Sequence, residues 1–142
     1  MTDEPLIAKK LGFIEACVHD LRTLARPDQI DHDLREQRFI EHTLQLAIQA
    51  ALDVASHIVS DERLGEPATN QDLFLLLARH GWTPAEQVAT LRAMAGFRNI
   101  LVHGYADVDR RIVQDVVAHR LDDLLRFAEG IRARLAVVAV AD

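Results

Sequence analysis

Apolar residues recur at spacings of three and four along most of this chain, which is the period of amphipathic helices. In residues 5–25 the apolar stripe consists of Ile7, Leu11, Ile14, Val18, Leu21 and Leu24. A segment from about residue 29 to residue 60 has no Gly or Pro. Asn70 as N-cap and Gly81 as stop bound a short helix over residues 70–80. The pattern therefore predicts helices over 5–25, 29–60 and 70–80.

Two more helices are predicted in the second half of the chain. Thr83 is the expected N-cap of the first, with Pro84 at the first helical position and Glu86 closing a capping box. This helix ends at His103, where Gly104 is expected to form a left-handed turn. Asp107 or Asp109 caps the last helix, whose apolar positions are Val113, Val117, Leu121, Leu124, Ala128, Ile131 and Leu135. The predicted fold is all-α, an up-and-down four-helix bundle with an extra short helix, in one domain spanning residues 1–142.

The middle of the longest predicted helix is apolar on more than one side. Between residues 44 and 59 the polar residues form one narrow stripe: His42, which precedes it, with Gln45, Gln49, Asp53, Ser56 and His57. Such a helix must be covered on several sides. We expect a second subunit to do part of the covering, and hence a homodimer. The alternative is a central helix of the monomer.

Composition and charge argue against a disordered, a secreted and a membrane-spanning protein. The chain has 142 residues, 49% of them hydrophobic, with 16 Lys and Arg against 22 Asp and Glu, a net charge of −6. This is too apolar for a disordered chain. The acidic N-terminus does not resemble a signal peptide, and no stretch is apolar enough to span a membrane. With a single cysteine, Cys17, the expected location is the cytoplasm.

Metal and nucleotide motifs are absent from the sequence. Seven His residues are present, but neither Glu-x-x-His nor His-Glu-x-x-His occurs. There is no Gly-rich phosphate loop and no Gly-x-Ser-x-Gly elbow. We therefore expect no metal and no cofactor.

Polar residues that can bind phosphate interrupt the apolar stretch at residues 96–105. Asn99 and His103 are four residues apart and share a helix face, whereas Arg98 lies about 140° from His103. Either the long Arg98 side chain reaches around the helix, or a site combines groups across a two-fold axis.

These residue types fit the chemistry of RNA cleavage. The reaction needs a base for the ribose 2′-OH, an acid for the leaving oxygen and a cation for the phosphorane charge. His103 can transfer protons, and Arg98 can hold a phosphate. The alternative is structural: Arg98 and Asn99 cap nearby carbonyls or pair with Asp53, and His103 merely ends a helix.

The segment from Met94 to Tyr105, with Asp107-Val108-Asp109 after it, resembles the Arg-x4-His-x-Tyr motif of HepT-like proteins, the toxin branch of the HEPN superfamily. Residues 51–59 are similar to the central helix of the same family. The likeness covers about residues 5–135, and its most specific part runs from Arg98 to Tyr105.

The resemblance implies a dimeric all-α HEPN bundle with two motifs at a shared cleft. It implies a metal-independent endoribonuclease encoded beside an MntA-type nucleotidyltransferase antitoxin, which uses Mg-ATP to attach AMP to the motif tyrosine. Arg98 and His103 match the ribonuclease pair, Asn99 the polar residue beside them and Tyr105 the AMP acceptor. Asp53 is a further residue that can support the site.

The net charge of −6 does not attract RNA as a whole, so a local strip of Arg92, Arg98, Arg110 and Arg111 would have to do so. Acidity equally suits a protein whose main partner is another protein. Two alternatives to the toxin ribonuclease therefore stay open: a non-catalytic dimeric binding module that is partner and substrate of a nucleotidyltransferase, and a purely structural helical dimer.

Overall fold

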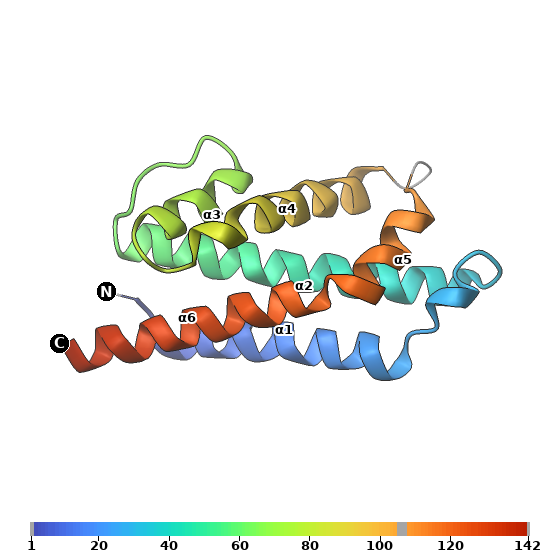
Figure 1. The fold of residues 1–142 in the computed structure, drawn as a ribbon, viewed down its shortest axis with the longest axis horizontal. Helices are drawn as coiled ribbons and strands as arrows, with labels where there is room; N and C mark the ends of the chain where they lie inside the picture. The colour runs from blue at the N-terminus through green and yellow to red at the C-terminus, as the bar shows by residue number, and fades with distance from the viewer. Residues whose placement is uncertain (1, 105–107, 142) are drawn as a thin grey trace.

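The computed structural model describes residues 2–104 and 108–141, and all regular structure within them is helical. Figure 1 shows the arrangement of the helices, which confirms the all-α class. Their bounds in chain order are α1 Glu4–Leu24, η1 Pro27–Gln29, α2 Leu34–Asp61, α3 Asn70–Arg79, η2 Ala85–Gln87, α4 Val88–His103, α5 Arg110–His119 and α6 Leu121–Ala141, where η marks short 3-10 turns.

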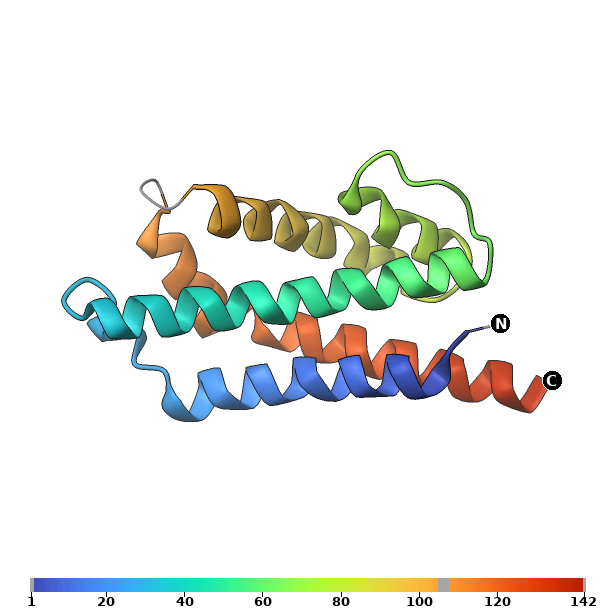
Figure 2. The same cartoon turned by 180° about the vertical axis from the view of Figure 1, so that it is seen from behind.

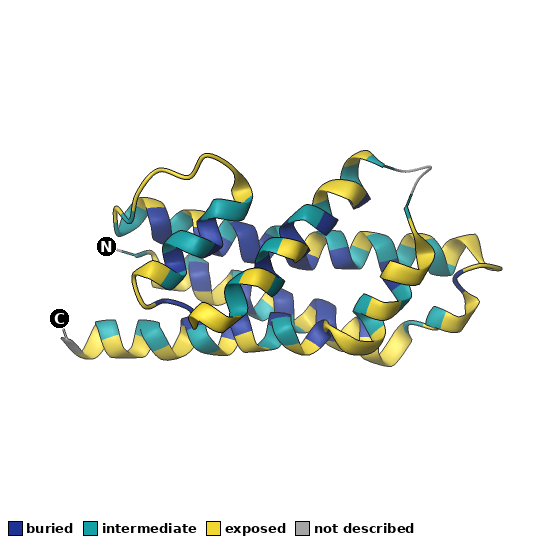
Figure 3. Cartoon of the chain, turned by 45° about the horizontal axis from the view of Figure 1, so that its top comes forward, coloured by how far each residue is buried: buried dark blue, intermediate teal, exposed yellow. Residues whose placement is uncertain are grey.

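Helix α2 is the centre of the molecule. It packs against α1, α3, α4 and α6, and the views from the two sides show α1 and α4 flanking it (Figures 1 and 2). Buried positions gather where these helices face one another (Figure 3). Both termini lie at one end of the bundle, whereas the C-terminal end of α4 lies at the other, beside α5.

The burial of α2 corrects the reasoning that led to a dimer. Ten residues of the apolar segment are buried within this one chain: Leu44, Ala47, Ile48, Ala50, Ala51, Leu52, Val54, Ala55, Ile58 and Val59. Helix α2 is therefore covered largely within the monomer, as in the alternative, although Leu46 is 37% exposed, and the homodimer stays a prediction.

The first two predicted helices are confirmed, with changes at their ends. Asp3 caps α1, but Leu24 is 62% exposed and does not join the stripe. Residues 29–60 do not form one helix, because a 3-10 turn at Pro27–Gln29 precedes α2. The carboxylate of Asp33 accepts hydrogen bonds from the backbone N–H groups of Arg35 and Glu36, so α2 begins at Leu34.

The last predicted helix is two helices, so the described residues hold six α-helices rather than the five expected. Asp109 caps α5 as predicted, and α5 ends at His119. Helix α5 packs against η1, where Gln114 Nε2 donates to the carbonyl of Pro27 at 2.9 Å. Helix α6 instead packs along α1. The chain must change direction at Arg120 to make both contacts.

Two predicted caps are wrong. Thr69, not Asn70, is the N-cap of α3, and the Asp72 carboxylate accepts from the backbone N–H of Thr69. Thr83 caps no helix: it is 5% exposed, its hydroxyl has no hydrogen-bond partner, and a 3-10 turn at Ala85–Gln87 leads into α4. Gly81 stops α3 as predicted, with a φ of 78°. No described helix is both long enough and apolar enough to cross a membrane.

Candidate active site

The last turns of α4 carry Arg98, Asn99 and His103. Helix α4 is continuous from Val88 to His103 because Leu91, Met94, Ala95, Phe97 and Leu101 form its buried stripe. Arg98 borders this stripe and is half-buried, whereas Asn99 and His103 are exposed. The helix therefore presents Asn99 and His103 on an accessible surface, with Arg98 at the edge of the core.

The structure decides how Arg98 is oriented. Its guanidinium Nη1 donates a hydrogen bond to Asn99 Oδ1 at 3.1 Å. Asn99 and His103 lie one turn apart on the same side of α4. The Arg98 guanidinium is thus drawn toward Asn99, which shares a helix face with His103, and this agrees with the first of the two arrangements considered from the sequence, while a site across a two-fold axis stays a prediction.

Arg98 also has an unused donor. Its Nε is buried and has no hydrogen-bond partner among the described residues. A buried donor without a partner is costly, so its presence calls for an explanation. The guanidinium is therefore held by one neutral acceptor and retains capacity to bind an anion.

Gly104 ends α4 for a reason other than the expected one. Its φ is −108°, so it does not adopt the left-handed conformation. Its N–H bonds to the carbonyl of Ile100 at 2.8 Å, and a Cβ on Gly104 would lie 2.9 Å from that same oxygen. Glycine is required here by close packing against the carbonyl.

Asp53 is engaged on α2. One carboxylate oxygen accepts from Gln49 Nε2 at 2.8 Å, and the other pairs with Lys10 Nζ of α1 at 3.3 Å. The structural alternative in which Arg98 pairs with Asp53 is therefore wrong for this chain. The proposed modification site, Tyr105, lies outside the described residues, and so does Asp107.

Two of the four arginines of the expected strip form ion pairs with carboxylates. Arg92 pairs with Asp72 at 3.8 Å, and Arg110 pairs with Asp31 at 3.5 Å. Arg98 and Arg111 form no ion pair with any described residue. Nevertheless α4 contains no Asp or Glu at all, so no carboxylate of its own helix opposes an anion at Arg98.

In the described part of the chain, no group of metal ligands accompanies these residues. Over residues 2–104 and 108–141, no three His, Cys, Asp or Glu side chains are grouped closely enough to hold a metal ion. A cleft of about 350 Å³ does adjoin α4, but it lies against α5 and is lined by Met94, Phe97, Ile112 and Val116 among others. It includes none of the three motif residues.

Arg35 and Arg38, in the first half of α2, were not considered from the sequence, and His42 was named only as part of a polar stripe. Arg35, Arg38 and His42 are all exposed there. Their spacing of three and four residues was the available signal, because it places them on one side of a helix.

Comparison with known proteins places this geometry in a family context. The family model described as ribonuclease HepT-like matches residues 14–131. The chain is 32% identical over 129 residues to the mRNA nuclease HepT of Shewanella oneidensis, covering 90% of this chain and 97% of that protein. It is 31% identical over 100 residues to the tRNA nuclease HepT of Aphanizomenon flos-aquae, covering 70% and 68%.

A solved structure agrees with the sequence matches. The tri-AMPylated HEPN toxin of Shewanella oneidensis, solved in complex with an MNT antitoxin, superposes with a TM-score of 0.83 at 32% identity. The match covers 94% of this chain and 99% of that one. The likeness therefore extends over nearly the whole of both chains.

Proposed function

The chain belongs to the HepT-like ribonuclease family, and we propose that it is the toxin of a toxin–antitoxin system, a metal-independent endoribonuclease that acts through Arg98, Asn99 and His103. The observation that carries this proposal is the hydrogen bond from Arg98 to Asn99, because it directs a guanidinium toward the side of α4 that bears an exposed imidazole.

The proposed reaction is attack by the ribose 2′-oxygen on the adjacent phosphorus. His103 removes the proton from the 2′-OH as the new P–O bond forms, and the bond from phosphorus to the 5′-oxygen breaks. The leaving 5′-oxygen gains a proton, from His103 or from a second copy of it. Arg98 stabilises the charge that develops on the phosphoryl oxygens, and Asn99 orients Arg98. The products carry a 2′,3′-cyclic phosphate and a 5′-OH.

We propose that the active form is a homodimer, in which two such motifs share a cleft. The family resemblance supports this, as does Ile100, which is 48% exposed in the turn of α4 between Asn99 and His103. An exposed Ile beside a polar site is suited to contact with a second subunit. Light scattering that gives the mass of one chain at micromolar concentration would contradict the dimer.

We propose that an MntA-like nucleotidyltransferase antitoxin silences the protein by attaching AMP to Tyr105. The support comes from the related toxin, which was solved tri-AMPylated and in complex with its MNT antitoxin. Tyr105 is the single tyrosine of the chain and follows His103 by two residues. A phosphate there would repel RNA and compete for Arg98. Mass spectrometry after incubation with the antitoxin and Mg-ATP tests this, with Tyr105→Phe expected to stay unmodified.

The ribonuclease proposal is tested by the chemistry of the RNA ends. Purified protein, shown by mass to carry no AMP, is incubated with mixed RNA that includes tRNA and mRNA, in EDTA. We expect fragments with 2′,3′-cyclic phosphate ends. Fragments with 3′-OH ends would exclude attack by the 2′-oxygen and hence the role given to His103.

The second candidate function is a non-catalytic binding module that is only partner and substrate of the nucleotidyltransferase. The net charge of −6 favours it, because RNA is not attracted to the protein as a whole. Absence of any cleavage by the unmodified, folded protein, together with modification of Tyr105 by the antitoxin, would select this function.

A further inference from the structure

We propose that the exposed side of the first half of α2, formed by Arg35, Arg38 and His42, binds the RNA backbone and leads it to the Arg98–His103 site. We name this surface the α2 stripe. The inference rests on the proposed ribonuclease function and adds to it the residues that hold the substrate outside the reacting groups.

The α2 stripe is cationic in an acidic protein. Between Leu34 and Leu46 the exposed residues of α2 are Leu34, Arg35, Arg38, His42 and Leu46, and none of them is acidic. At 100° per residue, Arg35, Arg38 and His42 lie within about 60° of one another and extend over about 10 Å of helix. A short row of two arginines and a histidine therefore faces solvent.

The nearby carboxylates do not neutralise this row. Neither Arg35 nor Arg38 forms an ion pair with a described residue. Glu36 is half-buried and accepts the backbone N–H of Arg26, whereas Glu41 accepts from Gln37 Nε2 at 3.2 Å. Asp33 accepts the N–H groups at the start of α2. Glu36 and Glu41 are thus occupied by other partners, whereas Asp33 stays exposed at the N-cap of α2 and lowers the positive charge at that end of the row.

Contacts with α3 show which side of α4 carries the motif residues. On α4, Arg92 pairs with Asp72 of α3, and Gly96 approaches Gln71 of α3. Asn99 and His103 continue this line one and two turns further along α4. Helix α3 therefore covers the first half of the line, and the motif residues lie beyond its cover.

The corresponding side of α2 leads to the α2 stripe. Ser56 and Ser60 line a common pocket with Leu73 of α3. Going back along α2 in steps of three and four from Ser56 passes through Asp53, Gln49 and Gln45 to His42 and Arg38. Because α4 runs antiparallel to α2, its C-terminal end lies beside the first half of α2 (Figures 1 and 2). The middle of the α2 line, at Gln49 and Asp53, borders α1, and the α2 stripe and the end of α4 lie at the same end of the bundle beyond the cover of α3.

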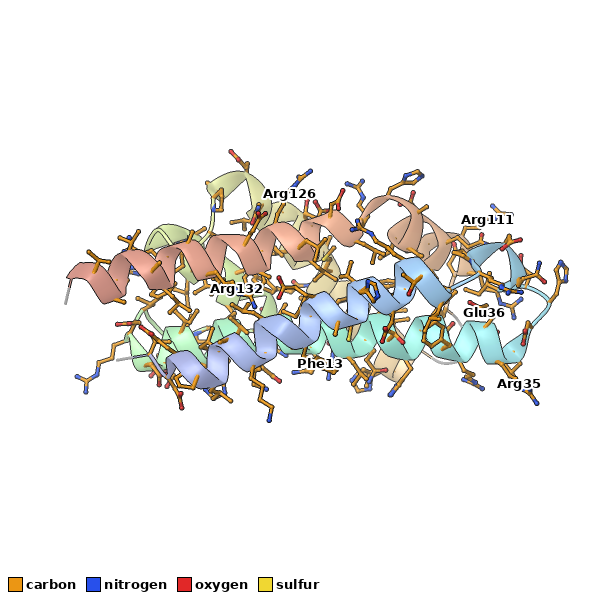
Figure 4. All side chains as sticks on the ribbon, turned by 90° about the horizontal axis from the view of Figure 1, so that it is seen from below. Phe13, Arg35, Glu36, Arg111, Arg126 and Arg132 are labelled. Atoms are coloured by element: carbon orange, nitrogen blue, oxygen red, sulfur yellow. The ribbon has the colours of Figure 1, made fainter. Side chains whose placement is uncertain are left out.

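The side chain of Arg35 is accessible to RNA from outside the bundle. In Figure 4 it projects from the end of α2 away from the bundle, whereas Arg111 lies on the opposite side of the molecule. The exposed residues of the α2 stripe include no Phe, Tyr or Trp side chain on which a base can stack, so the contacts expected there are to phosphates and carry no sequence information.

The experiment compares two double variants of equal charge. Arg35→Gln/Arg38→Gln removes the arginines of the α2 stripe, and Arg63→Gln/Arg79→Gln removes two exposed arginines at the opposite end of the bundle. Both are made in a His103→Ala background, so that RNA is not cleaved. Binding of a fluorescently labelled single-stranded RNA of mixed sequence is measured by anisotropy from about 50 to 200 mM salt.

We expect the stripe variant to raise Kd on the order of tenfold and to lower the slope of log K against log salt by about 1.4, which is two phosphate contacts on a single strand. Arg35→Lys/Arg38→Lys should restore most of the affinity, since Lys also contacts phosphate as a charge. The control variant should bind as its parent does.

Equal Kd and equal salt slope in the stripe and control variants would overturn the inference. A change in the oligomeric state of the stripe variant in solution would also overturn it. So would weakened antitoxin binding with unchanged RNA affinity. In either case the stripe would be a protein interface. The ribonuclease proposal is tested separately, by measuring RNA cleavage with the protein that retains His103. In that protein the stripe variant should raise KM for RNA more than it lowers kcat.

Discussion

Arg98 donates a hydrogen bond to Asn99 over 3.1 Å, although the two are neighbours in sequence and point about 100° apart around α4. The contact draws the guanidinium from the edge of the core toward the side of the helix that His103 shares. One unbroken helix can therefore supply both the cation and the proton-transferring group of the proposed site.

Asn99 is expected to act through Arg98. Asn99→Ala removes the acceptor, so the guanidinium is no longer held on the His103 side, and displacement of a catalytic group by about 1 Å costs on the order of 10²-fold in rate. We expect a fall of that size in single-turnover cleavage, with the fold unchanged by circular dichroism. Asn70→Ala, an exposed Asn in the first turn of α3, is the matched control. Equal cleavage by the two variants would remove Asn99 from the site.

Gly104 is expected to be intolerant of any side chain. In Gly104→Ala the Cβ would lie 2.9 Å from the Ile100 carbonyl oxygen, so the end of α4 must shift. We expect a loss of about 1 to 3 kcal/mol in the free energy of unfolding, as for other overpacked positions, and reduced cleavage. Chemical denaturation measures the first and a cleavage assay the second.

Gly12→Ala provides the comparison for Gly104. Gly12 lies within α1, and nothing is within 4 Å of its added Cβ. We expect this change to raise the free energy of unfolding by about 0.5 to 1 kcal/mol, because Ala is the better helix former. If Gly104→Ala were as well tolerated as Gly12→Ala, close packing would not be the reason for glycine at position 104.

Cys17 is expected to be unreactive in the folded protein. Burial, and to a lesser extent the nearby Asp20 carboxylate, raises the pKa of this thiol to about 11. A maleimide at pH 8 should therefore label the native protein slowly and the denatured protein fast, since the thiolate is the reactive form. Rapid labelling without denaturant would show that Cys17 is accessible.

The same pKa shift predicts the sign of a pH effect on stability. The folded protein holds the Cys17 proton more tightly than the unfolded chain, whose thiol has a pKa near 9.0. The free energy of unfolding should thus fall as the pH rises from about 9 to about 11. Cys17→Ala should show a smaller fall over that range, and an equal fall would assign the effect to other groups.

The sequence predicted helices where one buried stripe dominates and failed where tertiary contacts decide. Ile7, Leu11 and Ile14 mark α1 because every turn repeats the same burial. The break at Arg120 has no local signal, since neither Gly nor Pro stands there. It accompanies the packing of α5 on η1, where Gln114 binds the carbonyl of Pro27, far away in the chain. Thr83 looked like a cap by residue type alone, but the chain buries it.

The candidate site, like the fold, was predictable where local pattern decides and not where tertiary contacts do. Residue type, spacing and the family resemblance singled out Arg98, Asn99 and His103 as candidates, but the route of the Arg98 side chain depends on its rotamer. The sequence also did not show which arginines form ion pairs. Arg92, for example, pairs with Asp72, which lies on another helix. Periodicity shows which residues share a helix face, whereas these pairings depend on how helices pack.

The most direct test of the account is RNA cleavage in EDTA by the parent, His103→Ala and His119→Ala. His103 and His119 are both exposed residues that end a helix, α4 and α5 respectively, so the two variants are matched in burial and position. We predict that His103→Ala loses cleavage by at least about 10²-fold, as expected for a general acid or base, while His119→Ala cleaves like the parent. Undiminished cleavage by folded His103→Ala would contradict the assignment of this site.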